Sequence, residues 1–278
     1  MSVEYPSMAN VSERQSAPPS LAISTVIFAL RTAEDAGRPS LWIPLVRRIR
    51  EPFKGRWALP GGPLSHDESL QGAAARNLEE TTGLNPRYLE QLYAFGGLQR
   101  AAGRSGAPAV PSTRVVSIVY WALVQPTEAA LTRESDNVRW FPADCSGLDL
   151  AFDHQEIIDY ALWRLRNKME YASIAYHLLG EKFTLAQVRA VYEAVLGKEL
   201  DPANFRRQLK ATPDIEETEE YLQGGKHRPP RLYHYTGSTD AVRGPGPLTG
   251  PHPAATPSTH TSAQRSTLGT SSNPARHS

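Results

Sequence analysis

The charged side chains best placed for chemistry follow a glycine pair early in the chain. They are Glu68, Arg76, Glu79 and Glu80. Carboxylate oxygens, together with water, are what a hard cation such as Mg²⁺ requires, and it normally takes several of them. On a helix, Glu79 and Glu80 would point about 100° apart, so they would not face the same ion. The chemistry of this stretch therefore depends on which face of a helix displays each group.

A helix from about Glu68 to Thr82 is predicted to carry these side chains. Ser65 and Glu68 form a possible capping box, and the three alanines from Ala73 favour helix. Gly83 suits a left-handed C-terminal cap. A strand, a loop and then this helix are expected in that order.

The spacing from Gly62 to Leu84 resembles the Nudix box of diphosphate-hydrolysing enzymes. In that box one helix carries three acidic positions, which correspond here to 77, 80 and 81 and lie within about 60° of one another. This chain has Asn77, Glu80 and Thr81 there. One carboxylate with an amide and a hydroxyl is a poor Mg²⁺ site. We therefore expect that this chain is not an enzyme and has no catalytic residue and no bound metal. Mg²⁺ would be required only if residual hydrolysis exists.

A diphosphate ligand, which the box implies, needs hydrogen-bond donors around it. The candidate ligand-binding residues are Arg56, Trp57, Gly61, Gly62, Arg76, Glu80 and Arg114. Trp57 could stack on adenine, or it could simply belong to the core. Arg76 could bind phosphate, or it could pair with Glu68 across the loop and the helix. No further cofactor is expected.

Composition excludes some protein classes. The 278 residues, 40% of them hydrophobic, suffice for the cores of two domains. Lys and Arg (30) balance Asp and Glu (29), so a nucleic-acid surface must come from local placement of charge. The single Cys145 excludes an internal disulfide and is expected to be a packing residue. Without an apolar run of the ~20 residues that a membrane span needs, and without a signal peptide at the start, a cytoplasmic location and no membrane partner are expected.

The first domain is predicted to span residues 21–150. Residues 21–30, 40–46 and 114–124 are rich in β-branched and aromatic side chains and predict buried strands of a mixed sheet. Residues 99–112 are rich in Gly, Ala and Pro and predict a mobile flap at the rim of a pocket.

Both ends, residues 1–20 and 237–278, are polar and proline-rich and are predicted to be disordered. Arg243, Arg265 and Arg276 in the tail could touch DNA non-specifically, or they could be solvated.

A second domain is predicted over residues 151–236. Apolar stripes predict helices at about 157–165, 172–179, 185–195 and from Pro202, the last one capped by Asp201. Residues 215–222 and 231–235 then predict two strands around a basic turn. Helices followed by a hairpin predict a winged helix. The fold class is therefore α+β, with an N-terminal Nudix-like α/β/α sandwich followed by a winged helix-turn-helix domain.

The helix from Pro202 is predicted to display a basic face. Phe205 and Leu209 lie one turn apart and should pack inward, which turns outward Asn204, Arg206, Arg207 and Lys210. Arg and Lys suit phosphates and guanine edges, and Asn suits an adenine edge. The hairpin adds Lys226, His227, Arg228 and Arg231, where a wing would contact the DNA backbone or minor groove. A solvated helix face is the alternative, and the acidic run at 216–220 would have to face away from DNA.

Asp153 and His154 lie at the domain junction. A helix N-cap followed by a histidine is expected there rather than a catalytic pair, and a hinge between the domains is a further alternative.

With both halves considered, the chain resembles the Nudix-related transcriptional regulators of NAD metabolism, the NrtR family. The segments that carry the resemblance lie between Leu21 and Tyr235 and include residues 52–62 (PFKGRWALPGG), 151–154 (AFDH) and 204–207 (NFRR). The resemblance implies an ADP-ribose or related NAD-derived effector in the first domain. It also implies a homodimer whose winged helices bind double-stranded operators of NAD synthesis or salvage genes.

The predicted function is therefore a ligand-responsive transcriptional regulator, a repressor in our interpretation, with a catalytically degenerate Nudix domain. The main alternative is a Mg²⁺-dependent hydrolase of ADP-ribose or another nucleoside diphosphate derivative that uses Glu80, with or without Glu79. A third hypothesis is a small-molecule sensor that acts through a protein partner.

Overall fold

The computed structural model describes residues 18–32, 37–97, 100, 114–132, 134–144, 147–169, 173–223 and 229–237. All of them belong to one compact unit, Met1–Gly244. Most of both chain ends, the loop 99–112 apart from Arg100, and Cys145 lie outside the described residues, as do Lys226, His227 and Arg228 of the predicted basic turn. The predictions of disorder and of a mobile flap therefore concern residues outside the described ranges.

The strand β1 (Ser20–Thr32) is the centre of a seven-stranded sheet. The order is β3-β2-β1-β6-β5, with β4 paired to β1 and β7 paired to β2. The sheet is mixed, as predicted, because β1 runs parallel to β6 and antiparallel to β2. The other strands are β2 (Pro39–Arg47), β3 (Trp57–Ala58), β4 (Gly61–Pro63), β5 (Tyr88–Phe95), β6 (Val115–Val124) and β7 (Val138–Pro142).

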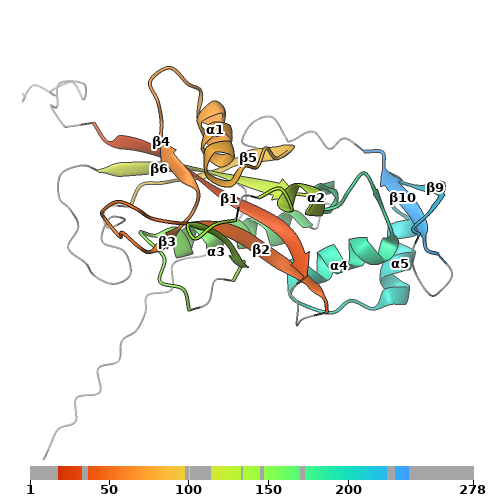
Figure 1. The fold of residues 1–278 in the computed structure, drawn as a ribbon. Coiled ribbons are helices and arrows are strands. Elements are labelled where there is room, and N and C mark those ends of the chain that lie inside the picture. Colours follow the sequence, from red (N-terminus) through yellow and green to blue (C-terminus); the bar gives the residue numbers. More distant parts are fainter. Residues whose placement is uncertain are drawn as a thin grey trace, which may run out of the picture. The chain divides into compact units, whose positions relative to one another are not determined.

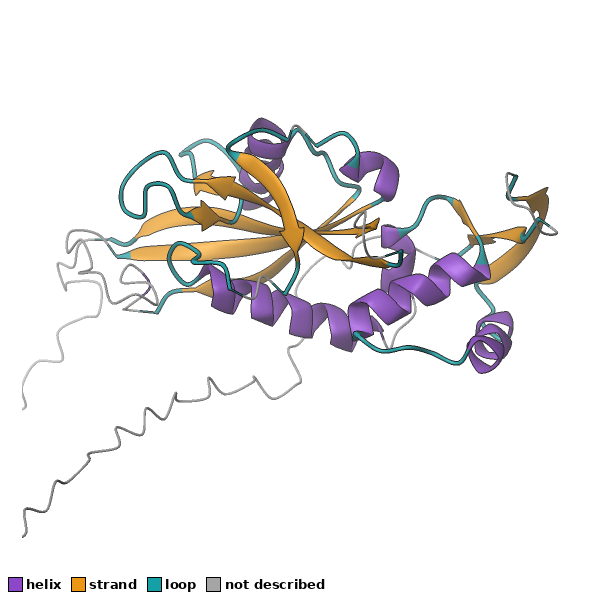
Figure 2. Cartoon of the chain, turned by 60° about the horizontal axis from the view of Figure 1, so that its bottom comes forward, coloured by secondary structure: helices purple, strands orange, loops and turns teal. Residues whose placement is uncertain are grey.

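Alternation along β1 gives the sheet two apolar faces. Ile23, Ile27 and Ala29 pack with apolar residues of α1 (Leu70–Thr82). Val26, Phe28 and Leu30 belong to the cluster that contains the apolar stripe of α3 (His154–Lys168). Helices therefore cover both faces of the sheet (Figures 1 and 2), which is the predicted α/β/α sandwich. A short helix, α2 (Pro126–Ala129), follows β6.

The helix α1 begins later than predicted. Its N-cap is Ser69, whose hydroxyl accepts the Gly72 N–H at 3.0 Å. The predicted capping box of Ser65 and Glu68 is wrong, because both residues lie in the preceding loop, where the Ser65 N–H donates to the Glu68 carboxylate at 2.7 Å. Gly83 ends the helix with a φ of 76°, as predicted.

Helices followed by a hairpin form the C-terminal part, as predicted. Beyond α3, which covers the large sheet, the elements are the 3₁₀ helix η4 (Ser173–Leu178), α4 (Leu185–Leu196), α5 (Pro202–Lys210), β9 (Ile215–Tyr221) and β10 (Arg231–Tyr235). A short strand, β8 (Lys182–Phe183), completes a second sheet in the order β8-β10-β9. Within the described ranges, no helix combines the length and the apolar content that crossing a membrane requires.

The apolar core runs from the large sheet into this C-terminal part. Phe28 and Trp121 of the sheet belong to the same cluster of buried side chains as Phe183, Val188 and Tyr233. Polar contacts also cross the junction, where Lys168 Nζ lies 2.5 Å from a carboxylate oxygen of Glu90. A displacement of α3 or of the sheet would therefore reach the winged helix through packed side chains.

Candidate functional site

The first candidate site surrounds Arg76 on α1. Its guanidinium donates two hydrogen bonds to Glu68, at 2.9 Å from Nε and 2.7 Å from Nη2. Arg76 and the Ser65 N–H hold the pKa of Glu68 down to about 2. The structural alternative for Arg76 is therefore confirmed, since Arg76 ties the loop to the helix.

The three positions that correspond to acidic residues of the box do not converge on a cation. Asn77 is buried, with 5% of its surface exposed, and its Oδ1 lies 3.4 Å from Arg76 Nη1. Glu80 pairs with Arg76 at 3.2 Å. Thr81 donates its hydroxyl back to the Asn77 carbonyl of its own helix. Among the described residues, no group of three or more His, Cys, Asp or Glu is placed to hold a metal ion.

The glycines before α1 are required by close approach. A Cβ at Gly61 would lie 2.2 Å from the Ile23 carbonyl oxygen of β1. A Cβ at Gly62 would lie 2.5 Å from Asn77 Oδ1. The β4 backbone therefore lies close beside β1, to which it is paired, and close to Asn77 of α1, and only glycine fits there without displacing a neighbour.

The remaining predicted ligand residues lie on neighbouring segments. Arg56 pairs with Asp149 at 3.1 Å, and half-buried Trp57 packs edge-on against Phe141 with ring centroids 4.9 Å apart. Arg114 precedes β6 and donates to the Gly96 carbonyl at 3.3 Å. The packing of Trp57 favours its structural alternative, while Arg56 and Arg114 keep exposed or half-exposed guanidinium groups.

The junction residues have structural roles that the sequence did not predict in full. His154 begins α3, is buried, and accepts the Leu59 N–H on Nδ1 at 2.9 Å. Burial lowers its pKa to about 4. Asp153 is the N-cap residue, but its side chain makes no capping bond and pairs with Arg100 instead. The His154 bond attaches the start of α3 to the segment just before Gly61, and the Asp153 pair attaches it to Arg100.

The second candidate site is the exposed face of α5. Asp201 caps the helix, as predicted, by accepting the Asn204 N–H at 2.7 Å. Leu209 is buried, and Phe205 packs against Tyr192 with ring centroids 5.2 Å apart. The four polar residues predicted to face outward, Asn204, Arg206, Arg207 and Lys210, are exposed. Arg207 Nη2 donates to Asn204 Oδ1 at 2.7 Å, so these two side chains form one polar unit.

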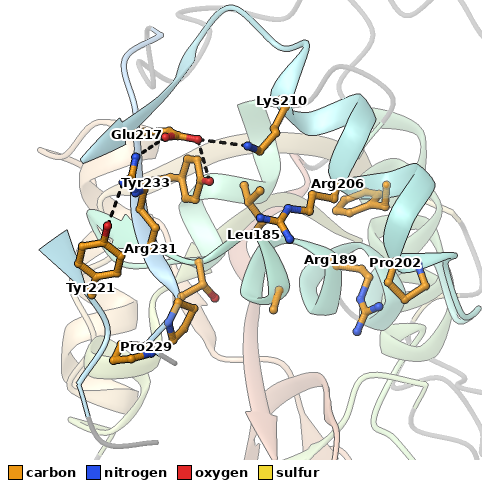
Figure 3. Close-up of a pocket in the computed structure, with 14 residues that line it drawn as sticks. Leu185, Arg189, Pro202, Arg206, Lys210, Glu217, Tyr221, Pro229, Arg231 and Tyr233 are labelled. Carbon is orange, nitrogen blue, oxygen red and sulfur yellow. Dashed lines mark hydrogen bonds and ion pairs between the residues drawn. The ribbon is translucent and has the colours of Figure 1, made fainter. Parts of the chain in front are cut away.

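Between α5 and the hairpin lies a pocket of about 690 Å³, here called the α5–hairpin groove. It is lined by Arg189, Arg206, Lys210, Glu217, Tyr221, Arg231 and Tyr233, among others. Figure 3 shows Glu217 facing Lys210, Arg231 and Tyr233. Its carboxylate lies 3.3 Å from Lys210 Nζ and 2.5 Å from Arg231 Nη1, and it accepts the Tyr233 hydroxyl at 3.1 Å.

The expectation that the acidic run faces away from the basic surface is wrong for Glu217, which lies within it. Sequence reasoning also missed Tyr221, whose hydroxyl accepts from Arg231 Nη2 at 2.9 Å. The sequence signal was available, since the two strands must pair and this places acidic and basic positions opposite each other. A shift in strand register then determined which of them meet.

Comparison with known proteins matches both halves of the chain. The family model described as NUDIX domain matches residues 22–160, and the model described as NrtR DNA-binding winged helix domain matches residues 175–235. The "ADPR responsive transcriptional repressor NtrR" of Acinetobacter baylyi is 33% identical over 221 residues, which cover 78% of this chain and 82% of that protein.

Solved structures agree over both domains. The NrtR of Shewanella oneidensis matches with a TM-score of 0.65 and 31% identity, covering 80% of this chain and 96% of the other. The same protein complexed with a 27mer DNA matches with a TM-score of 0.63 and 31% identity, covering 77% and 93%. An "ADP-ribose pyrophosphatase" of Methanocaldococcus jannaschii is 34% identical over 124 residues, covering 44% of this chain and 67% of that protein.

A Nudix domain followed by a DNA-binding winged helix domain in one chain defines a class of transcriptional regulators. This chain belongs to the NrtR family of Nudix-related transcriptional regulators.

Proposed function

We propose that this chain represses transcription by binding operator DNA as a homodimer through α5 and the hairpin. ADP-ribose, or a related NAD-derived nucleotide, binds beside α1, is not hydrolysed, and releases the DNA. The relatives that support this proposal are a repressor named for its response to ADP-ribose and an NrtR crystallised with DNA. Operators of NAD synthesis or salvage genes are the expected targets, and no cofactor beyond the effector is required.

The fate of the three box positions carries the non-enzymatic part of the proposal. A divalent cation beside a diphosphate needs several carboxylate oxygens. Here Asn77 is buried, Thr81 bonds to its own helix, and Glu80 already faces Arg76. This donor set does not fit Mg²⁺. Arg56 and Arg114 keep guanidinium groups that can bind phosphate oxygens, without the cation that would position water for attack.

Coupling between the two sites has a physical route. The Leu59 N–H binds His154 at the start of α3, and the last turn of α3 places Lys168 against Glu90 and packs in the core shared with the winged helix. A ligand changes operator affinity only by its different affinity for the DNA-binding and released arrangements. The predicted hinge at Asp153 and His154 remains part of this proposal.

The test begins with genomic fragments captured on the purified full-length chain, with and without ADP-ribose. Fragments that are retained only without ADP-ribose identify the operator, and their affinity is then measured by fluorescence anisotropy. We expect ADP-ribose to weaken operator binding at least about tenfold, within the usual range of allosteric coupling. A chain that binds ADP-ribose but retains no DNA fragment would favour the third hypothesis, a sensor that acts through a protein partner.

The second candidate function is a Nudix hydrolase, favoured by the identity to an ADP-ribose pyrophosphatase over the first domain. Incubation with ADP-ribose and Mg²⁺ or Mn²⁺ tests it. Formation of AMP that disappears in Glu80→Gln would establish the enzyme. Formation of AMP that persists in Glu80→Gln would point to a contaminating activity.

A further inference from the structure

The α5–hairpin groove contains a carboxylate where a DNA-binding groove is expected to be purely basic. Glu217 is the only acidic residue among those that line the described part of this groove, whereas Arg189, Arg206, Lys210 and Arg231 line it as cations. Its side chain is 42% exposed, so water and solutes reach it. A carboxylate in this position repels the phosphates of an approaching duplex.

The donors around Glu217 form an oxyanion cradle. Arg231 Nη1, Lys210 Nζ and the Tyr233 hydroxyl converge on its two oxygens. They come from β10 and from the last turn of α5, the two elements that a winged helix presents to DNA. Guanidinium, ammonium and hydroxyl groups are also the usual donors to phosphate oxygens. The cradle would fit a phosphodiester as well as it fits the carboxylate.

A strand irregularity builds this cradle. Tyr233 pairs with Glu217 while Arg231 pairs with Tyr221, so the interval of β9 between the paired positions is longer than that of β10. Bulges of this kind redirect side chains beside functional sites. Here the bulge lets the Arg231 guanidinium reach both Glu217 and the Tyr221 hydroxyl (Figure 3).

We propose that this cradle is a binding subsite for a backbone phosphate of duplex DNA, and that the Glu217 carboxylate occupies it in the free protein. The proposal rests on the DNA-binding function proposed above. When DNA binds, a phosphate takes over Arg231 and Lys210, and Glu217 turns to solvent. The three donors that lower the pKa of Glu217 keep it ionised, and so able to compete with phosphate, at neutral pH.

The test compares Glu217→Gln with Glu219→Gln. Glu219 lies in the bulged part of the same strand, and no ion pair to it is found within the described residues. Both variants lose one negative charge, but only the first frees the cradle. Affinity is measured for the operator and for a scrambled duplex, because a phosphate subsite should act on both. Each measurement is repeated over a series of salt concentrations.

Glu217→Gln removes the cost of displacing the carboxylate, and that cost is at most about what one phosphate contact contributes, which is about eightfold in affinity at ~0.1 M salt. We expect Glu217→Gln to gain by up to this amount on both duplexes. Glu219→Gln should change affinity less than about twofold, because an unpaired exposed charge is screened by salt. Melting temperature and ADP-ribose affinity should stay unchanged in both variants.

Weaker DNA binding by Glu217→Gln would overturn the proposal, because Glu217 would then position Arg231 and Lys210 for DNA. Equal gains in both variants would also overturn it, since only net charge would matter. Wild-type protein that binds no duplex even at low salt would instead overturn the proposed DNA-binding function together with this inference.

Discussion

Two clusters of this protein use the same side-chain types for different purposes. In the α1 cluster, Glu68 has 16% of its side chain exposed and accepts two hydrogen bonds from one edge of the Arg76 guanidinium. In the α5–hairpin groove, Glu217 has 42% of its side chain exposed and receives donors from two separate elements. The first pair joins a loop to its own helix and so maintains local structure, whereas the second holds donors that another anion can take over.

The difference shows that an arginine–glutamate pair is informative only with its surroundings. The α1 cluster lies beside close-packed glycines and the buried Asn77, so its members have little freedom to exchange partners. The groove is open to solvent, where an ion pair contributes little net stability and its partners exchange at low cost. Stability should therefore depend on the first region and DNA affinity on the second.

The largest expected effect on stability follows from Gly61→Ala. The new Cβ would meet the Ile23 carbonyl oxygen at 2.2 Å, and this backbone atom cannot yield without distorting β1. We expect a loss of about 3 kcal/mol in unfolding free energy, measured by urea denaturation. Gly97→Ala is the matched control, because its Cβ would make an ordinary contact at 3.6 Å. Equal stability of the two variants would contradict the close packing of β4 on β1.

A pH dependence of similar size is expected from His154. Burial is the first cause that lowers its pKa from 6.5 to about 4, and nearby Arg100 and Arg48 lower it further while Asp153 opposes them. Because the folded pKa is depressed, the stabilisation is complete above pH ~6.5 and falls by about 3 kcal/mol as the pH approaches ~4. Chemical denaturation at a series of pH values measures it.

The control for this pH dependence is His154→Gln, whose side-chain carbonyl can still accept the Leu59 N–H but does not titrate. Its stability should change less over the same pH interval. If both proteins lose stability in parallel, the titrating group is not His154.

The exposed face of α5 is tested by the double variant Arg206→Ala with Arg207→Ala. Both side chains are exposed on α5, so removing them should cost about two phosphate contacts, which is about 60-fold in operator affinity at ~0.1 M salt. ADP-ribose affinity and melting temperature should remain unchanged. The matched control replaces exposed Arg47 and Arg139, which carry the same charge on β2 and β7. A comparable loss in the control would mean that only net charge is sensed.

The smallest expected effect comes from Glu68→Gln. The Arg76 bonds lower the pKa of Glu68 from 4.5 to about 2, so the stabilisation is present above pH ~4.5 and is lost as the pH falls toward ~2. Melting temperatures between these pH values should fall more steeply for wild-type protein than for Glu68→Gln. Identical curves would show that the Arg76–Glu68 pair does not contribute to stability. In the groove, Glu217→Gln should leave the melting temperature unchanged at neutral pH.

Most of the fold could be predicted because its signals are local. The strand compositions, the left-handed cap at Gly83 and the N-cap at Asp201 depend on neighbours in sequence. The α1 start was misplaced because Ser69, rather than Ser65, caps the helix. The strands β3 and β4, which pair with the predicted strands β2 and β1, were not predicted because they are too short to give a periodic signal.

The candidate sites were predicted less completely, because their geometry depends on distant contacts. The outward face of α5 followed from helix periodicity alone. The position of Glu217 could not be predicted from periodicity, because a bulge between β9 and β10 determines it. The burial of His154 against Leu59 joins residues 95 positions apart, which no local pattern indicates.

We propose that the α1 region binds an NAD-derived nucleotide without cleaving it, and that this binding weakens the hold of the winged helix on the operator. One sample contains full-length protein, labelled operator, ADP-ribose and Mg²⁺. Anisotropy follows operator binding and chromatography follows the nucleotides, so the sample tests operator release and ADP-ribose cleavage together. We expect prompt release of the operator while the ADP-ribose remains intact. Accumulation of AMP at a rate that Glu80→Gln abolishes, with the operator still bound, would contradict this proposal.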